Sequence, residues 1–142
     1  MKGDVKVLLE FRKLSPHLKK VWKLKVSSDL TRIVLEGVTV NANGRVTGLN
    51  LYKKGLDGEI PRATGELAEL KSLSLPRNDL YGAIPPLVNL KHLEEIHLYQ
   101  NRLEGQLPAW IGELTALANL NIHSNWFGGP VPDSLSNLSK LK

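Results

Sequence analysis

The sequence predicts an α/β repeat solenoid, a coil of short stacked units that share one core. The first observation is a phrase that recurs four times in the 142 residues: LNLYKKGLDGEIP from Leu49, LSLPRNDLYGAIP from Leu73, IHLYQNRLEGQLP from Ile96 and LNIHSNWFGGPVP from Leu120. The second observation is the nearly constant step between copies, which is 24, 23 and 24 residues. Self-similarity at a period of this size is the signature of stacked repeats.

The first half of each unit predicts a short strand. Apolar residues occupy the pattern L-x-x-L-x-L at Val46, Leu49 and Leu51, and the same pattern returns in the three later units. Alternation at a period of two is typical of a strand with one buried face. A strand this short cannot bury its apolar face alone, so we expect the units to stack as a parallel sheet over a continuous core.

The second half of each unit predicts a turn and an inward-facing segment. Asparagine stands three residues after the strand at Asn78, Asn101 and Asn125, whereas the first unit has Lys54. An asparagine amide can hydrogen-bond the backbone of a sharp turn. A terminal unit has only one neighbour, so we expect it to tolerate Lys54. The following L-x-G-x-I-P segment supplies apolar residues, a glycine for close backbone approach and a proline.

The full phrase L-x-x-L-x-L-x-x-N-x-L-x-G-x-I-P resembles the plant-type leucine-rich repeat of receptor-kinase ectodomains, polygalacturonase-inhibiting proteins and algal and protist proteins. The resemblance covers residues 46–142, as four repeats and the start of a fifth at Leu138, with no clear C-terminal cap. It implies a right-handed coil with a concave parallel β-sheet. It further implies a second, smaller sheet along the L-x-G-x-I-P segments and 3₁₀ turns on the convex side.

Residues 1–45 are expected to form an N-terminal cap of two short helices and a hairpin strand. The first helix is predicted over residues 4–14 with Asp4 as its N-cap, because Val7, Leu8 and Phe11 share one face. Ser15-Pro16 is a typical start for the second helix, whose apolar side would hold Leu18, Val21 and Trp22.

Two strands are expected after these helices. Ile33-Val34-Leu35 has strand composition, and Val38–Val40 is predicted to form a hairpin with residues 46–51 through the Asn43-Gly44 turn. Such a cap would cover the open end of the first repeat. The related plant caps usually carry a disulfide in the stretch aligned with residues 29–40, which this cysteine-free chain lacks, so the resemblance favours algal or protist relatives.

The net charge of +5 is concentrated in the cap. Residues 1–45 carry ten Lys and Arg and four Asp and Glu, whereas residues 46–142 carry nine and ten. The favoured interpretation of these charges is a solvated helix face, and the alternative is a binding site for an anionic partner. Aromatic residues are not interleaved with the basic ones, so we do not expect nucleic-acid binding. We expect no membrane contact from this segment. The absence of cysteine favours a reducing, cytoplasmic setting. If the chain is a segment of a receptor, we expect an extracellular setting instead.

The candidate binding site consists of the strand side chains that point away from the core, onto the concave face. The residues predicted to contact a partner are Tyr52, Lys53, Ser74, Arg77, Glu95, His97, Tyr99, Asn121 and His123. Tyrosine and arginine are common anchors of interfaces, although any one position could be merely solvated. Trp126 replaces small or charged residues of the other repeats and is expected to be an exposed patch.

These residues predict recognition rather than catalysis. The sequence lacks the serine-hydrolase, zinc-protease and phosphate-loop motifs, so we expect no enzyme and no cofactor. His97 and His123 have only Glu94 and Glu95 near them, and we expect no metal site. The predicted function is protein or peptide binding through the concave face. Two alternatives stay open: glycan binding, with Tyr52 and Tyr99 stacking on sugars, or a structural segment of a larger receptor or signalling protein.

Overall fold

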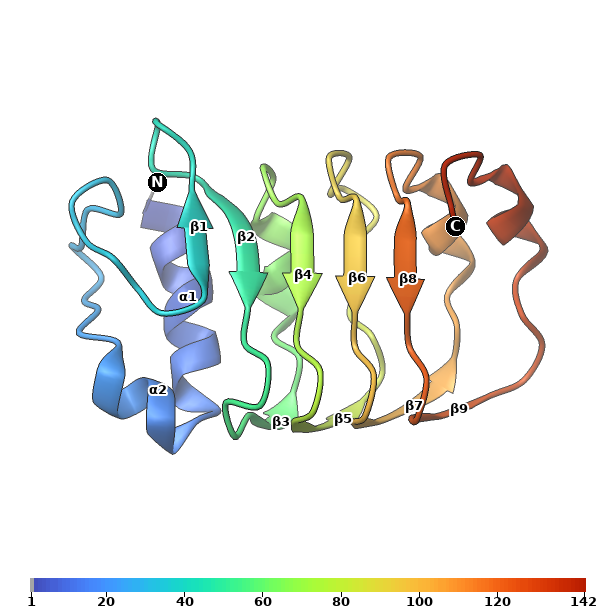
Figure 1. Cartoon of the computed structure of the whole chain (residues 1–142), viewed down its shortest axis with the longest axis horizontal. Coiled ribbons are helices and arrows are strands. Elements are labelled where there is room, and N and C mark those ends of the chain that lie inside the picture. The colour runs from blue at the N-terminus through green and yellow to red at the C-terminus, as the bar shows by residue number, and fades with distance from the viewer. Residues whose placement is uncertain (1) are drawn as a thin grey trace.

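A computed structural model describes residues 2–142 of the protein as a coil whose successive turns lie side by side along the long axis (Figure 1). Two helices precede the strands. They are α1 (Lys2–Lys13) and α2 (Pro16–Val21). Neither is long and apolar enough to cross a membrane. The expected division of the chain at residue 45 stays a prediction.

The concave face is a five-stranded sheet in the order β1-β2-β4-β6-β8. Its strands are β1 (Val38–Val40), β2 (Val46–Asn50), β4 (Ser72–Ser74), β6 (Glu95–His97) and β8 (Asn119–Asn121). The strands from β2 onward are parallel, and Leu49 lies beside Leu73, Leu73 beside Ile96 and Ile96 beside Leu120. The predicted parallel sheet is therefore confirmed, with equivalent positions of successive repeats in register.

A second parallel sheet runs along the lower edge in Figure 1, as the resemblance implies. Its strands are β3 (Asp57–Glu59), β5 (Asp79–Gly82), β7 (Arg102–Gln106) and β9 (Trp126–Gly128). Short 3₁₀ helices form the convex side behind the concave sheet. They are η1 (Arg62–Glu66), η2 (Ala109–Glu113) and η3 (Asp133–Asn137).

The core is a stack of leucines enclosed by the two sheets and the convex turns. Fully buried representatives from successive repeats are Leu51, Leu75 and Leu98. Beyond η3, Leu138 is buried, and the amide of Lys142 donates to the carbonyl of Ala118. The same bond joins equivalent residues in each earlier repeat, so the chain reaches the strand position of a fifth repeat.

The turn asparagines join each repeat to the one before it. The Asn101 amide nitrogen donates to the carbonyls of Leu75 and Leu98 at 3.0 and 3.1 Å, and its oxygen accepts from the Leu80 amide at 3.1 Å. Asn78 makes the equivalent contacts one repeat earlier. The predicted role of asparagine is confirmed, and it explains how polar backbone is satisfied beside an apolar core.

Lys54 cannot make these contacts, and the cap makes others in their place. The Ser15 hydroxyl donates to the Lys54 carbonyl while accepting from the Leu18 amide at 3.1 Å as the N-cap of α2. The Lys54 ammonium lies 3.1 Å from Glu36 of the cap. The first repeat is therefore closed by residues that precede it in the chain.

Three predictions for the cap are wrong in detail. Helix α1 begins at Lys2, so Asp4 lies inside its first turn and binds Arg45 and the Val46 amide instead of capping the helix. Residues 33–35 form no strand, and Val34 is almost fully exposed, because β1 already occupies the place beside β2. Val21 is 41% exposed rather than packed. The predicted hairpin of β1 with β2 is confirmed, with an irregularity between Thr39 and Val40.

Candidate functional site

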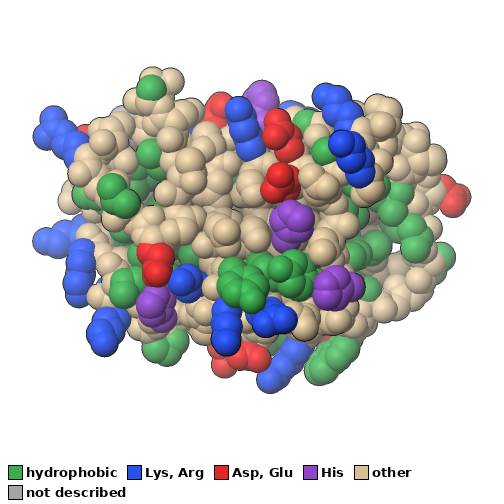
Figure 2. Space-filling model, viewed as in Figure 1, with side chains coloured by type: hydrophobic (Ala, Val, Ile, Leu, Met, Phe, Trp, Pro, Cys, Tyr) green, Lys and Arg blue, Asp and Glu red, His purple; other side chains and the backbone are tan. Residues whose placement is uncertain are grey.

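The concave face carries a band of aromatic, imidazole and charged side chains. Figure 2 shows hydrophobic and histidine side chains together over β4, β6 and β8, with acidic groups directly above them, basic groups directly below, and further basic side chains along the upper edge. The parallel register places Ser74 beside His97 and His97 beside Asn121. Neighbouring strands lie about 4.8 Å apart, so side chains at equivalent positions form contiguous rows across the sheet.

Tyr99 and His123 form the closest aromatic contact of this band. Their ring centroids are 4.8 Å apart, with an angle of 15° between the planes. Tyr99 is half-buried, while His123 is exposed and lies within hydrogen-bond distance of the Ser124 hydroxyl at 2.9 Å. Stacking restricts both rings before any partner arrives, and rigid aromatic side chains lose little entropy on binding.

A second contact joins Tyr52, in the row of Tyr99 and His123, to Arg77 in the adjacent row. The guanidinium carbon of Arg77 lies 5.8 Å from the centre of the Tyr52 ring, within the range of a cation–π contact. The Arg77 Nε also donates to the Gln100 side-chain oxygen at 2.6 Å. This guanidinium is therefore held in place on an otherwise exposed surface, with donors left for a partner.

Glu95 and His97 form a polar group beside the aromatic row. His97 Nε2 lies 3.6 Å from the Glu95 carboxylate, which also accepts from the Ser72 hydroxyl at 3.4 Å. All three side chains are half-buried. The group places negative charge on β6, on the side of the band opposite to Arg77.

One backbone feature of this face was missed in the sequence interpretation. The residues that follow the strands are left-handed: Lys53, Arg77, Gln100 and Ser124 have φ between 49° and 56°. Non-glycine residues rarely adopt this conformation, since the side chain approaches the following carbonyl. Its repetition at equivalent positions fixes the direction in which Lys53 and Arg77 leave the sheet.

The remaining predicted residues contribute less to these clusters. Ser74 and Asn121 flank His97 on the neighbouring strands, and Lys53 is exposed at the end of β2. Trp126 is 65% exposed, as predicted, but lies on β9 of the second sheet, away from the concave strands. Within residues 2–142 no three histidine or acidic side chains are placed to share a metal ion.

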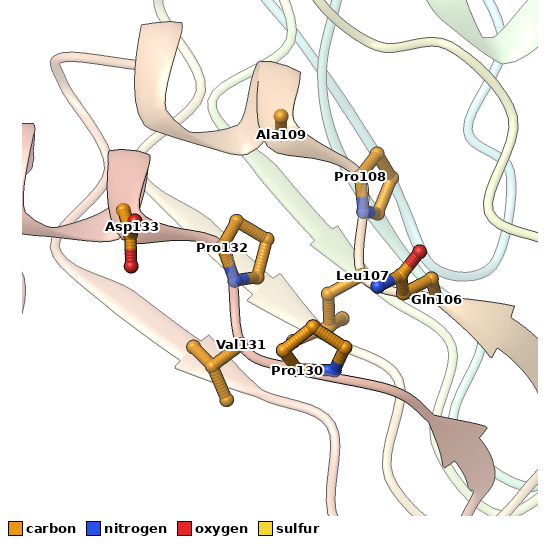
Figure 3. Close-up of a pocket in the computed structure, with 8 residues that line it drawn as sticks. All are labelled: Gln106, Leu107, Pro108, Ala109, Pro130, Val131, Pro132 and Asp133. Carbon is orange, nitrogen blue, oxygen red and sulfur yellow. The ribbon is translucent and has the colours of Figure 1, made fainter.

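A hollow of about 400 Å³ lies between the last two repeats. Figure 3 shows Pro108, Pro130 and Pro132 around it, with the Val131 side chain pointing away from Leu107 and Pro108. Its lining has one ionisable group, Asp133, and no aromatic ring. Among its lining residues Gln106 and Asp133 carry polar side chains, and both are exposed, so the hollow offers few groups that could orient a small ligand.

Comparisons with known proteins place this geometry in a family. The profile of the Leucine Rich Repeat family matches residues 92–114 and 116–138. A chain of the crystal structure of the BIR3–SERK2 complex from Arabidopsis thaliana superposes with a TM-score of 0.84 over 97% of this chain and 77% of that chain, at 29% identity. The chain is built of plant-type leucine-rich repeats. The repeat sequence and the paired parallel sheets are both features of this leucine-rich-repeat protein.

Sequence relatives are plant receptor kinases. A probable inactive receptor kinase of Arabidopsis thaliana is 37% identical over 93 residues, which is 62% of this chain and 14% of the relative. The receptor-like kinase TMK4 of the same plant is 46% identical over 54 residues, 38% of this chain and 6% of the relative. The leucine-rich-repeat chain thus spans only a small part of these relatives, and the match lies in their repeat region.

A second solved structure is that of the plant peptide hormone receptor RGFR1 in complex with RGF2. It superposes with a TM-score of 0.67 at 31% identity, over 78% of this chain and 21% of that chain. The missing cap disulfide favoured algal or protist relatives, whereas the relatives and structures named here are plant proteins. A leucine-rich-repeat cap without cysteine is therefore compatible with marked similarity to plant receptor ectodomains.

Proposed function

We propose that this protein is a recognition module that binds an extended peptide or protein segment on its concave face. The observation that carries the proposal is the pre-packed aromatic band, in which Tyr99 stacks on His123 and Arg77 lies over Tyr52. Aromatic and arginine side chains dominate the energetics of protein interfaces. Their rings here are already fixed on a sheet, so little conformational entropy remains to be lost.

The charges along the face indicate the chemistry of the partner. Lys53 and Arg77 lie three residues beyond the ends of β2 and β4, whereas Glu94 and Glu95 lie where β6 begins. A segment bound across the strands would present acidic or carbonyl groups to the first pair and basic groups to the second. Complementary charge of this kind sets the orientation of a partner and speeds its association.

The similarity to peptide hormone receptor RGFR1 supports this class of ligand. In that complex a receptor with the same repeat fold holds RGF2. The ligand of the present protein is a separate question, because the two chains share 31% identity and the match covers 21% of the receptor. We infer from the fold and the band a peptide ligand, with its sequence set by the residues of this concave face.

A displayed library of random peptides, selected on the intact protein, tests the proposal. We expect selected peptides to lose about tenfold or more in affinity for Tyr99→Ala and His123→Ala, as interface anchors do. Tyr81→Ala is the matched control, since Tyr81 is an exposed tyrosine on the second sheet. Peptides that bind all four proteins equally would contradict the concave site.

Glycan binding is the second candidate, favoured by the exposed ring of Tyr52 and the half-buried ring of Tyr99, which lie at equivalent positions two strands apart on the same face. Aromatic faces flanked by amide and carboxylate groups suit the apolar and polar sides of a sugar ring. A glycan array probed with the intact protein separates the two candidates. If the protein binds a defined glycan and Tyr52→Ala abolishes that binding, glycan recognition is favoured. An array without signal would contradict glycan recognition.

A further inference from the structure

The second sheet presents an outer surface that the proposed function does not use. Along each strand one set of side chains points inward, such as Leu80 and Leu103, and the alternate set points to solvent. We call the solvent side the lateral face. It consists of Asp57, Glu59, Asp79, Tyr81, Arg102, Glu104, Gln106 and Trp126.

Aromatic and acidic residues are paired across the strands of the lateral face. Glu59 of β3 lies in register with Tyr81 of β5. Glu104 of β7 lies in register with Trp126 of β9. Tyr81 is 47% exposed and Trp126 is 65% exposed, which is unusual for large aromatic side chains on a sheet. The same combination, one ring beside one carboxylate, therefore occurs twice on one surface.

The Trp126 pair borders a hollow of about 500 Å³. Glu104, Gln106 and Trp126 form its walls, and Gly105, Gly128 and Gly129 contribute backbone without side chains. A methyl group added at Gly105 or Gly128 would meet no atom within 4 Å, so the space above them is open. Gln106 stands between this hollow and the proline-lined one, where Figure 3 shows its amide.

The charges of the lateral face are unbalanced. It carries four carboxylates and one guanidinium, and that guanidinium, from Arg102, is 3.3 Å from Asp79. Within residues 2–142 neither Glu59 nor Glu104 takes part in an ion pair. An exposed carboxylate beside an exposed ring can hold a cation by charge and by cation–π attraction together.

We propose that the lateral face binds a basic, extended protein segment, with one arginine or lysine at the Glu104–Trp126 pair and another at the Glu59–Tyr81 pair. The two rings are on β5 and β9, two strand spacings apart and offset by two residues along the strands, which separates them by roughly 12 Å. An extended chain advances about 3.3 Å per residue, so the long side chains of basic residues three positions apart can reach both pairs. The expected motif is therefore a basic residue, two intervening residues and a second basic residue.

Charge complementarity selects this occupant over others. An acidic or nucleic-acid partner would meet four carboxylates, and an apolar segment would bury Glu59 and Glu104 without a counter-charge. The competing occupant is the basic cap of a second copy, because residues 1–45 carry ten Lys and Arg and four Asp and Glu.

A labelled peptide with the repeat Arg-Gly-Gly-Arg-Gly-Gly-Arg tests the proposal on the intact protein, with the citrulline version as a neutral control of the same shape. We expect saturable binding of the arginine peptide and a shift of the Trp126 indole NMR signal, which is distinct from those of buried Trp22 and half-buried Trp110. The double variant E59Q/E104Q should bind about tenfold more weakly or worse, and Trp126→Ala should do the same.

The matched control is E66Q/E113Q, which removes two exposed carboxylates from the convex turns η1 and η2 and leaves the lateral face intact. If E66Q/E113Q weakened peptide binding as much as E59Q/E104Q, the effect would come from the net charge of the protein, and the proposal would be overturned. Equal binding of the citrulline peptide would overturn it as well. Reversible self-association in the ultracentrifuge that E59Q/E104Q abolishes would assign the face to a second copy instead. Concave variants such as Tyr99→Ala should leave this binding unchanged, so the two proposals fail separately.

Discussion

Arg45 and Asp4, 41 residues apart in the chain, join helix α1 to the first strand of the repeats. Arg45 Nε and Nη2 donate to the two carboxylate oxygens of Asp4 at 2.9 and 3.2 Å, and the Val46 amide donates to the same carboxylate at 2.9 Å. Asp4 is only 2% exposed. The hydrogen bond to Asp4 raises the pKa of Arg45, so this guanidinium stays charged.

Loss of Asp4 should detach the cap from the first repeat. We expect Asp4→Ala to lower the free energy of unfolding by about 3 kcal/mol, because it leaves Arg45 and the Val46 amide without their acceptor. Asp4→Asn should cost less, since its amide oxygen can still accept one bond. Urea denaturation measures both. Glu10→Ala, which removes an exposed pair with Lys13, should have little effect, and an equal loss there would contradict this role for Asp4.

The asparagine ladder should be the most sensitive polar feature of the repeats. Asn101→Ala leaves the Leu80 amide without its acceptor and removes one of two asparagine donors from each of the Leu75 and Leu98 carbonyls, at an expected cost of about 2 kcal/mol. Asn89→Ala is the control, because Asn89 is exposed on the convex side. Thermal unfolding followed by circular dichroism compares the two. Similar melting temperatures for both variants would show that the ladder contributes little.

The left-handed backbone at Ser124 predicts a substitution that stabilises the fold instead of destabilising it. Ser124→Gly should stabilise the fold by about 1 kcal/mol, because glycine adopts positive φ without strain. Ser124→Val should destabilise it by a similar amount, since a β-branched side chain resists this conformation. Paired denaturation curves settle the point. A stabilising valine would mean that the strand end relaxes to a different backbone.

The cluster around Glu36 should make stability depend on acid pH. Hydrogen bonds from His17 and then Lys54 lower the pKa of Glu36 below its usual 4.5. A carboxyl group whose folded-state pKa is depressed contributes stability above its unfolded pKa, and that contribution is lost as the pH falls through the folded value. Glu36→Gln should therefore narrow the difference in denaturation midpoint between pH 7 and pH 3. The effect should be small because the group is exposed. Glu66→Gln serves as the comparison, and an identical narrowing there would contradict the assignment.

The repeat pattern predicts the fold well because each apolar position is decided locally and then copied. Leu73, Leu75 and Leu80 are buried where the alternation places them, and Asn78 bonds where a turn needs it. The cap follows its sequence less closely, since tertiary partners decide it. Asp4 has a good N-cap sequence but is engaged by Arg45, and residues 33–35 have strand composition but no strand edge beside them.

The candidate site divides in the same way. Strand periodicity predicts which side chains leave the core, and hence the row that holds Tyr52, Tyr99 and His123. It does not predict that Tyr99 stacks on His123 or that Arg77 reaches Gln100, because these contacts depend on rotamers and on left-handed backbone. The lateral face was missed for another reason. Its pairs depend on the register of β3 with β5 and of β7 with β9, which differs from the repeat alignment.

The most direct test of the central claim is an NMR titration of the isotopically labelled protein with a peptide selected on it. The concave site predicts that backbone amide shifts concentrate on β4, β6 and β8, with the largest changes next to Tyr99 and His123, and that His123→Ala removes them. Shifts confined to the convex turns, or undiminished in His123→Ala, would contradict it.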